Sequence, residues 1–408
     1  MEREGYTMKK RLAAALILAA AVSAAGCGSG QKAETPAVSQ EEKKGETKAE
    51  QPKEEGAEEE AAQGESDMPW KIEPLAERVT LKVGNMASTS PHLPTYIAQQ
   101  KGWLDAVGIE VEPVLFNSGP AMMEACSAGA WDCGSTGIGG VITGILGHDI
   151  RVLAPAARDE GGHQAFFARK DSPIVQDGQG HGTCPEVYGT PESWKGKEIF
   201  CAKGTTNHFT LYKTLESLGL TLDDVNVVNM EVSSANTAFK AGQGDVVGVW
   251  GPLVYSEDKA DLVMVSSDAW VKTGIVTNYV ANPKAWEENE EAITKWLEVC
   301  IMTGEWIQEH QEEAAVYMTQ MYEEDGYPST DEENLKILQN NPFCSLEYDA
   351  DIVTMNSDNT MNKMAQQTYD AMSVFVKMGN YTQEQLEALR DSGNFLTAPV
   401  ERIAAEHK

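Results

Sequence analysis

The segment Gly204-Thr205-Thr206-Asn207-His208 combines residue types that can bind an anion without a charged side chain. It follows an apolar stretch and precedes a helical pattern, so its backbone N–H groups are expected at a helix N-terminus. Free N–H groups and the helix dipole favour a negatively charged group there. Glycine lets a ligand approach the backbone, and Thr205 or Thr206 can cap the helix. Capping alone is the rival interpretation, but the adjoining Asn207 and His208 favour a role in ligand binding.

Further small or polar residues follow other predicted strands, where open α/β sheets bind ligands beyond the carboxyl ends of the strands. Five candidates of this kind lie after the first three strands: Ser88, Thr89, Ser118, Ser135 and Thr136. His92 follows the first of these loops and could point into the same groove or lie on a helix surface. Glu231 follows the strand predicted over 226–230, and its side chain faces the groove in one of the two possible registers of that strand. Together these residues predict a polar cleft.

Asp159 and Trp250 could add a charge and an aromatic wall to this cleft. Asp159 stands between Arg158 and Glu160, where the first series of elements ends. Arg158 could pair with an anion, and Asp159 or Glu160 could hold the amine of a zwitterion. Salt bridges at a hinge explain the same three residues equally well. Trp250 ends a predicted strand, from which its ring could pack on a ligand.

Catalytic motifs are poorly represented. The sequence contains no Gly-x-Ser-x-Gly nucleophile turn, no phosphate loop and no His-Glu-x-x-His metal motif. Residues 134–140 are glycine-rich but lack the lysine and the spacing of a phosphate loop. We therefore expect a binding protein rather than an enzyme, without a metal ion or a cofactor.

Alternating strands and helices must position these residues. A first series of strands is predicted over 79–84, 109–116, 131–135 and 150–156, with helices over 94–101, 120–128 and 141–146. A second series has strands over 198–202, 226–230, 246–250 and 262–266, with helices over 207–218 and 235–241. This repetition predicts an α/β fold with mainly parallel sheets, and segments 164–168 and 277–281 could join the two series. Beyond Pro283 the chain is expected to be almost all helix.

The amino end has the features of an export signal. Basic residues 9–11 precede an apolar run over 12–22, which is too short to span a bilayer as a stable helix. Small residues then lead to Cys27, and the ending at 24–27 resembles the bacterial lipobox, in which the cysteine is acylated. An ordinary signal peptide with an incidental cysteine is the alternative.

Residues 28–77 are rich in Glu, Lys, Gln, Ala, Gly and Ser and nearly lack apolar side chains larger than alanine. Such a stretch buries too little apolar surface to offset the entropy of ordering, so we expect a disordered acidic linker. A lipid anchor at Cys27 followed by this linker suits a soluble body that must stay near a membrane. The formal net charge of −31 over 408 residues argues against a nucleic-acid partner, because no basic stripe is available for phosphates.

Six cysteines remain besides Cys27, an even number that indicates disulfides in an exported protein. Proximity in the sequence suggests three bridges: Cys126–Cys133, Cys184–Cys201 and Cys300–Cys344. Metal binding is the rival interpretation, but no Cys-x2-Cys pair or flanking histidine supports it.

The order of these elements, together with several local motifs, resembles the extracytoplasmic solute-binding proteins of ATP-driven importers. The branch that it resembles most is the nitrate, taurine and aliphatic-sulfonate type. The matching segments are 94–104, 108–112, 127–134, 194–199, 204–208 and 239–246, the last running on to Trp250-Gly251-Pro252. Each motif is weak alone, and their order and spacing carry the resemblance over about residues 79–281. The glycine-rich insertion around 177–184 departs from the family pattern.

The resemblance implies a two-lobed periplasmic-binding-protein type II fold with two hinge crossings. It implies signal peptide 1–27, linker 28–77, lobe 1 over 78–163 and 281–408, and lobe 2 over 164–280. Ligand would be enclosed between the lobes and handed to the permease and ATPase of an ABC importer, with the protein lipid-anchored outside the cytoplasm. The alternatives are an enzyme of this fold, a sensory receptor, or a binder of a pyrimidine precursor of thiamine; the cysteine-rich metal motif of a related pyrimidine-precursor synthase has no counterpart here.

Overall fold

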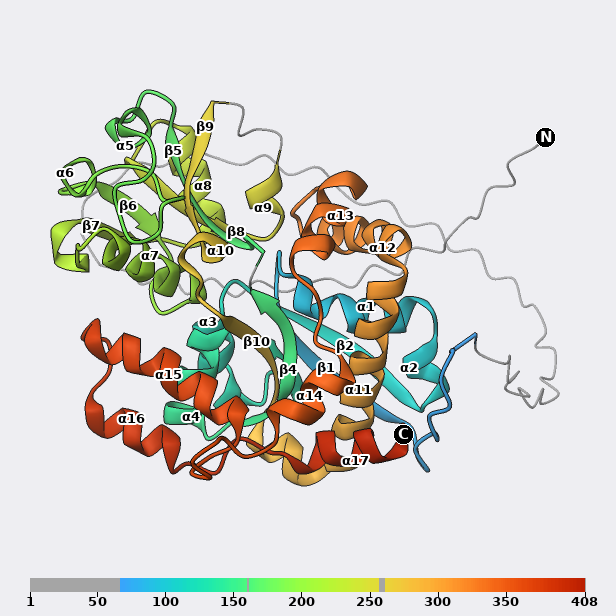
Figure 1. The fold of residues 1–408 in the computed structure, drawn as a ribbon. Helices are drawn as coiled ribbons and strands as arrows, with labels where there is room; N and C mark the ends of the chain where they lie inside the picture. The colour runs from blue at the N-terminus through green and yellow to red at the C-terminus, as the bar shows by residue number, and fades with distance from the viewer. Residues whose placement is uncertain (1–66, 160, 257–260, 408) are drawn as a thin grey trace, which may run out of the picture. The chain divides into compact units, whose positions relative to one another are not determined.

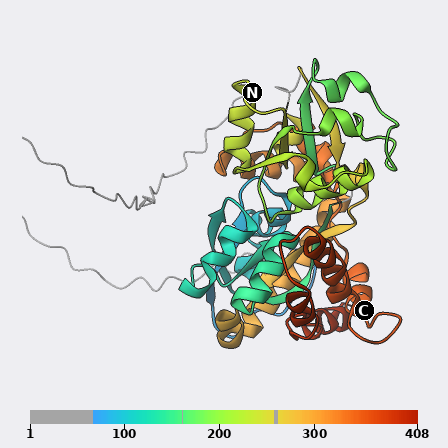
Figure 2. The same cartoon turned by 90° about the vertical axis from the view of Figure 1, so that its left-hand side faces the viewer.

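The computed structural model describes residues 67–159, 161–256 and 261–407. They contain two five-stranded sheets, each with its own helices, so the described body has two lobes (Figure 1). Figure 2 shows the second lobe above the first. The two-lobed α/β fold is therefore confirmed. The signal peptide with Cys27, and the linker up to residue 66, lie outside the described residues.

The first sheet contains β1 to β4 and one late strand. Its strands are β1 (Val79–Met86), β2 (Ile109–Phe116), β3 (Cys133–Thr136), β4 (Arg151–Asp159) and β10 (Ile275–Ala281), in the order β2-β1-β3-β10-β4. The helices between these strands are α1 (Leu93–Gln100), α2 (Trp103–Ala106), α3 (Gly119–Glu124) and α4 (Ile138–His148). The sheet is buried because helices pack on it, and Leu81, Val83 and Val280 are each 0% exposed.

The second sheet has the same arrangement. Its strands are β5 (Gln164–Arg169), β6 (Glu198–Cys201), β7 (Asn226–Asn229), β8 (Val246–Trp250) and β9 (Leu262–Ser267), in the order β7-β6-β8-β5-β9. The helices of this lobe are α5 (Pro173–Asp177), α6 (Pro191–Trp194), α7 (Thr206–Ser217), α8 (Val232–Lys240), α9 (Pro252–Tyr255) and α10 (Asp268–Val271). Phe166 and Leu215 belong to its own apolar core.

The expectation of mainly parallel sheets is wrong in one respect. β1 pairs in parallel with β2 and β3, but β10 runs antiparallel to β3 and β4. In the second sheet, β5 is likewise antiparallel to β8 and β9. The reason is that both joining segments become interior strands of a sheet. The chain passes between the sheets twice, after β4 and before β10, and these passages are the two hinge crossings.

The carboxyl-terminal third is helical, as predicted. It comprises α11 (Pro283–Glu309), α12 (Gln311–Glu324), α13 (Asp331–Asn340), α14 (Leu346–Ile352), α15 (Lys363–Lys377), α16 (Gln383–Arg390) and α17 (Ala398–Glu406). The apolar face of α11, with Ile293 and Trp296 fully buried, packs into the core of the first lobe. Figure 1 shows α13 near α9 of the second lobe, and these two helices are in contact.

Residues 67–77 differ from the linker that the sequence predicts. Ile72 is buried, Trp70 packs edge-on against Trp103, and Asp67 accepts a hydrogen bond from the Trp103 indole at 2.9 Å. Two large apolar side chains thus fix this short segment to the first lobe, so the ordered body begins before residue 78.

The predicted disulfides Cys126–Cys133, Cys184–Cys201 and Cys300–Cys344 are also wrong, because the thiols at 126, 133, 184, 201 and 300 are not bridged. The Cys126 sulfur accepts a hydrogen bond from Asn282, and the Cys300 sulfur lies 3.3 Å from the Thr95 hydroxyl.

No helix within the described ranges is long and apolar enough to span a bilayer.

Candidate functional site

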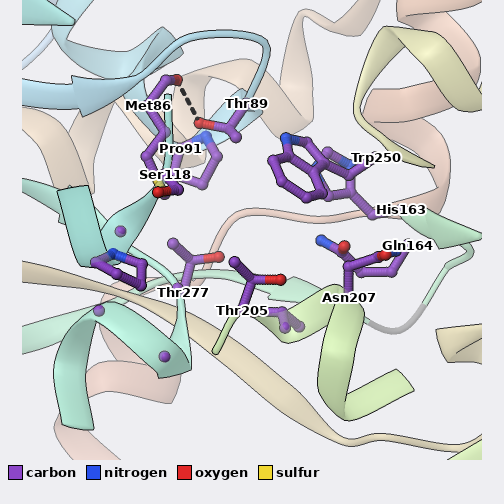
Figure 3. A pocket seen from close by; sticks show the side chains of 16 residues that line it. Met86, Thr89, Pro91, Ser118, His163, Gln164, Thr205, Asn207, Trp250 and Thr277 are labelled. Carbon is purple, nitrogen blue, oxygen red and sulfur yellow. Dashed lines mark hydrogen bonds between the residues drawn. The ribbon is translucent and has the colours of Figure 1, made fainter. Parts of the chain in front are cut away.

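A cavity lies where the carboxyl ends of the two sheets face one another (Figure 3). The volume of this cavity that the centre of a water molecule can reach is about 40 Å³. The first lobe contributes Met86, Thr89, Pro91, Ser118, Gly119, Pro120, Gly137, Gly139, Gly140 and Thr277. The second lobe and the crossing that leads to it contribute His163, Gln164, Thr205, Thr206, Asn207 and Trp250. This is the placement that open α/β sheets use for ligands.

The N-terminus of α7 borders the cavity from the second lobe. Thr205 is the N-cap: its hydroxyl accepts from the backbone N–H of His208 at 3.4 Å and donates to the carbonyl of Ala202 at 2.7 Å. Thr206 begins the helix, and its hydroxyl has no hydrogen-bond partner among the described residues. The capping interpretation therefore holds for Thr205, and the hydroxyl of Thr206 stays available for a ligand.

The N-terminus of α4 borders the same cavity from the first lobe. Gly137 is its N-cap and Gly139 lies in its first turn. A β-carbon at Gly139 would lie 1.7 Å from the carbonyl oxygen of Gly204, and one at Gly137 would lie 2.8 Å from the Thr206 hydroxyl. Only glycine allows so close an approach, so two helix N-termini converge on one small space. Their dipoles favour negative charge there.

The cavity lining carries little formal charge. Among the described residues that line it, none is Asp, Glu, Lys or Arg. His163 is the one titratable side chain among these described residues, and burial lowers its pKa to about 4, so it is neutral at pH 7. An anion here would be held by backbone N–H groups, hydroxyls and dipoles.

Asp268 fixes the crossing that carries two of the lining residues. Its carboxylate accepts from the backbone N–H of Gln164 at 3.2 Å and of Ala269 at 2.8 Å, and also from those of Gly162 and His163. Burial nevertheless raises the pKa of Asp268 to about 7, with these backbone donors opposing the shift. The carboxylate is therefore committed to the backbone and does not line the cavity.

The structure brings some of the sequence candidates together. Six of them line the cavity: Thr89, Ser118, Thr205, Thr206, Asn207 and Trp250. Asn207 is also part of the framework, because its amide donates to the carbonyl of Val249 at 3.3 Å and its oxygen accepts from the Cys201 thiol. Ser118 caps α3 by accepting from Ala121 N–H at 3.4 Å.

Three other candidates lie under the cavity wall rather than in it. Ser135 is fully buried and donates to Asn85 at 2.9 Å. Thr136 packs beneath the wall, where a β-carbon at Gly140 would lie 2.0 Å from its hydroxyl oxygen. The Nδ1 atom of His208 accepts from the backbone N–H of Gly204 at 3.3 Å. These side chains support the wall, and a direct role in ligand binding stays a prediction for them.

Three further candidates, His92, Ser88 and Glu231, lie away from the cavity lining. His92 lines a second cavity, where its Nε2 atom is 3.7 Å from a carboxylate oxygen of Asp325. Ser88 is buried in the loop between the two cavities, with a positive φ of 62°. Glu231 stands at the N-cap position of α8, and partial burial raises its pKa. Asp159 ends β4, and its side chain lies outside what the structure describes.

Sequence reasoning missed several lining residues. In the sequence, the glycines of residues 134–140 suggest only an incomplete phosphate loop, whereas in the structure Gly137, Gly139 and Gly140 form the N-terminal part of α4. His163 and Gln164 carry no local signal, because they reach the cavity through the pairing of β5 with β8. Met86, Pro91, Pro120 and Thr277 look like ordinary framework residues in the sequence.

The class of protein that this fold and cavity define is a two-lobed binding protein. The sequence profile described as NMT1/THI5-like matches residues 89–314, more than half of the chain, and the chain belongs to this family. A Brachyspira hyodysenteriae protein named as an ABC transporter periplasmic binding protein is 27% identical over 282 residues, which cover 69% of this chain and 80% of that protein. A Bacillus subtilis protein named as aliphatic sulfonates-binding is 28% identical over 58% of this chain and 67% of its own length.

Solved structures share the fold. The aliphatic sulphonate binding protein SsuA of Escherichia coli superposes with a TM-score of 0.57 at 17% identity, covering 76% of this chain and 91% of SsuA. The nitrate-binding protein NrtA of Synechocystis PCC 6803 gives 0.60 at 12% identity, covering 81% and 89%. The desulfurization enzyme DSZB gives 0.51 at 14% identity, covering 81% and 100%. At such identities the likeness establishes the periplasmic-binding-protein fold and leaves the solute open.

Proposed function

We propose that this chain is the extracytoplasmic solute-binding component of an ABC importer, and that its solute is a small anion or zwitterion of the sulfonate, taurine or nitrate type. The observation that carries the proposal is the convergence of two helix N-termini, those of α4 and α7, on one small cavity between the lobes. The relatives named as ABC transporter and sulfonate-binding proteins support the same class.

The cavity suits a single dispersed negative charge. Each helix N-terminus favours an anion by about 0.3–1 kcal/mol at an exposed site and up to about 2 kcal/mol when partly buried. The hydroxyl of Thr206 and the free N–H groups of the first helical turns add hydrogen bonds, which are stronger when the acceptor is charged. A bare cation would meet the positive ends of both dipoles and no acidic side chain among the described lining residues. An anion is therefore the better occupant.

The arrangement of the lobes supports delivery to a transporter. Gly139 approaches Gly204, and Gly251 approaches Ser88, so the backbones of the two lobes nearly touch on either side of the cavity. A solute held there is shielded from water and leaves only when the lobes separate. We infer that a permease and an ATPase receive it, and that acylation of Cys27 keeps the protein at the outer face of the membrane.

An enzyme of the same fold is the second class to consider, because DSZB shares the architecture. The cavity offers hydroxyls and one neutral histidine, but no hydroxyl is hydrogen-bonded to His163 among the described residues. A nucleophile would need such a base within reach. Binding without chemistry is thus the better supported function.

A thermal-shift screen tests the proposal. The full chain is heated with alkanesulfonates, taurine, nitrate, amino acids or a pyrimidine precursor of thiamine. A solute present at 100 times its Kd stabilises the native state by about 2.7 kcal/mol and should raise Tm by several degrees. Stabilisation by sulfonates or nitrate is expected. Stabilisation by the pyrimidine alone would contradict the proposed solute class, and new products after incubation would indicate an enzyme.

A further inference from the structure

One side of the cavity holds three buried polar atoms that have no hydrogen-bond partner among the residues that the structure describes. They are Nδ1 of His163, Oε1 of Gln164 and Nε1 of Trp250. The three residues are only 3%, 6% and 6% exposed, and all line the cavity. Buried polar groups in native proteins are almost always paired, so unpaired atoms on three residues that line one cavity indicate that something else completes them.

Strand pairing places these three residues together. In the antiparallel register of β5 and β8, Gln164 lies directly opposite Trp250, so the two side chains leave the same face of the sheet. The backbone N–H of Gly251 donates to the carbonyl of His163 at 3.3 Å, which brings the histidine beside them. Figure 3 shows His163, Gln164 and Trp250 gathered on one side of the cavity, and Met86, Pro91 and Ser118 on the other.

The chemistry of this side differs from that of the helix N-termini. Nε1 of Trp250 can only donate, whereas Oε1 of Gln164 can only accept. The N-termini of α4 and α7, with the hydroxyl of Thr206, offer donors for a charged head. A short solute can therefore place its anionic head at the helices and its other end against Gln164 and Trp250.

Resting on the proposed function, we propose that His163, Gln164 and Trp250 form a subsite for a neutral group that both donates and accepts hydrogen bonds, so that the chain prefers a sulfonate with a hydroxyl tail. A hydroxyl can donate to Gln164 and accept from Trp250. A methyl group satisfies neither atom. An ammonium group donates to Gln164 but leaves the Trp250 N–H facing a cation.

Three two-carbon sulfonates separate these cases: 2-hydroxyethanesulfonate, ethanesulfonate and taurine. They share the head and differ only in the tail, which is hydroxyl, hydrogen or ammonium. Calorimetric titration of the full chain should give a Kd for 2-hydroxyethanesulfonate roughly tenfold lower than for ethanesulfonate, because burying two unpaired groups is costly. Taurine should bind more weakly than 2-hydroxyethanesulfonate.

Two variants test whether the preference for 2-hydroxyethanesulfonate over ethanesulfonate arises from this subsite. Gln164→Leu removes the acceptor, and Trp250→Phe removes only the donor and keeps most of the ring. Each should move the ratio of the two Kd values toward one. Trp194→Phe is the matched control, because this buried tryptophan lies in the same lobe, outside the cavity, and already donates to the Tyr188 carbonyl at 2.8 Å. It should keep the wild-type ratio.

The outcomes distinguish this inference from the function on which it rests. Equal affinities for the hydroxyl and hydrogen tails would overturn the subsite and leave a sulfonate-binding protein. Tightest binding of taurine would also overturn it, since an acidic partner would then have to meet the amine. If none of the three binds while another solute class does, both proposals fail.

Discussion

Gly139 and Gly204 approach so closely across the cavity that a β-carbon on Gly139 would lie 1.7 Å from the carbonyl oxygen of Gly204. Gly139 belongs to the first turn of α4 in the first lobe, and Gly204 precedes α7 in the second. The contact joins the two helix N-termini that we propose to bind the solute. Enclosure of the solute therefore depends on the absence of a side chain at position 139.

Gly139→Ala should weaken ethanesulfonate binding by tenfold or more without destabilising the fold. Alanine favours a helix over glycine, so the substitution leaves α4 intact but keeps the lobes apart. If the enclosing arrangement becomes rare, the apparent Kd rises in inverse proportion to its population. Gly147→Ala is the control, because it lies in the same helix with open space around it. Equal affinities of the two variants would contradict the role of this contact.

Phe209 lies in α7 of the second lobe but packs into the core cluster of the first, with its ring 5.6 Å from that of Phe375 in α15. Phe209→Ala should therefore weaken solute binding roughly tenfold by removing an apolar contact between the lobes. Leu211→Ala in the same helix should instead cost about 2–5 kcal/mol of stability with little change in affinity, because Leu211 packs in the second lobe's own core. Calorimetric titration and urea unfolding of both variants test this, and an affinity loss in Leu211→Ala alone would refute it.

His208 should make the protein less stable in acid. Burial, with a smaller effect of Lys203, lowers its pKa in the folded chain from 6.5 to about 4. Between these values the unfolded chain binds the proton and the folded chain does not, so stability falls as the pH drops from 6.5 toward 4. From pH 7.5 to pH 5, wild type should lose roughly 2 kcal/mol more than His208→Gln in urea unfolding. Asp268 and Asp325 shift in the opposite sense, but they are common to both proteins.

Cys27→Ser should move the protein from the membrane fraction to the soluble fraction. The expectation rests on the lipobox-like residues 24–27, since acylation of this cysteine would supply the membrane anchor. Fractionation of cells that express each form measures the change. Continued membrane association of the serine variant would show that another feature holds the protein there.

The sequence predicted those parts of the fold that local patterns determine. The strand predicted over 109–116 is β2 residue for residue, and the helix predicted over 207–218 is α7, shifted by one residue to Thr206–Ser217. Pairings between segments far apart in the chain could not be predicted from these local patterns. The strand directions of β5 and β10 depend on partners far along the chain.

The residues of the candidate site likewise divide into those that a local sequence pattern predicts and those that it does not. Thr205 and Thr206 carry a local signal, because hydroxyls beside a glycine mark a helix N-terminus. His163 and Gln164 carry none, because only the register of β5 with Trp250 brings them to the cavity. The cysteine pairs failed for a similar reason, since Cys126 meets Asn282 rather than Cys133.

Calorimetric titration of the Thr205→Ala, Thr206→Ala double variant with ethanesulfonate tests the central claim most directly. The variant loses the N-cap of α7 and the hydroxyl that faces the cavity, so its Kd should be at least about tenfold higher than that of wild type. Circular dichroism should confirm that it remains folded. A folded variant that binds ethanesulfonate as tightly as wild type would remove the α7 N-terminus from the site and contradict this account of solute binding.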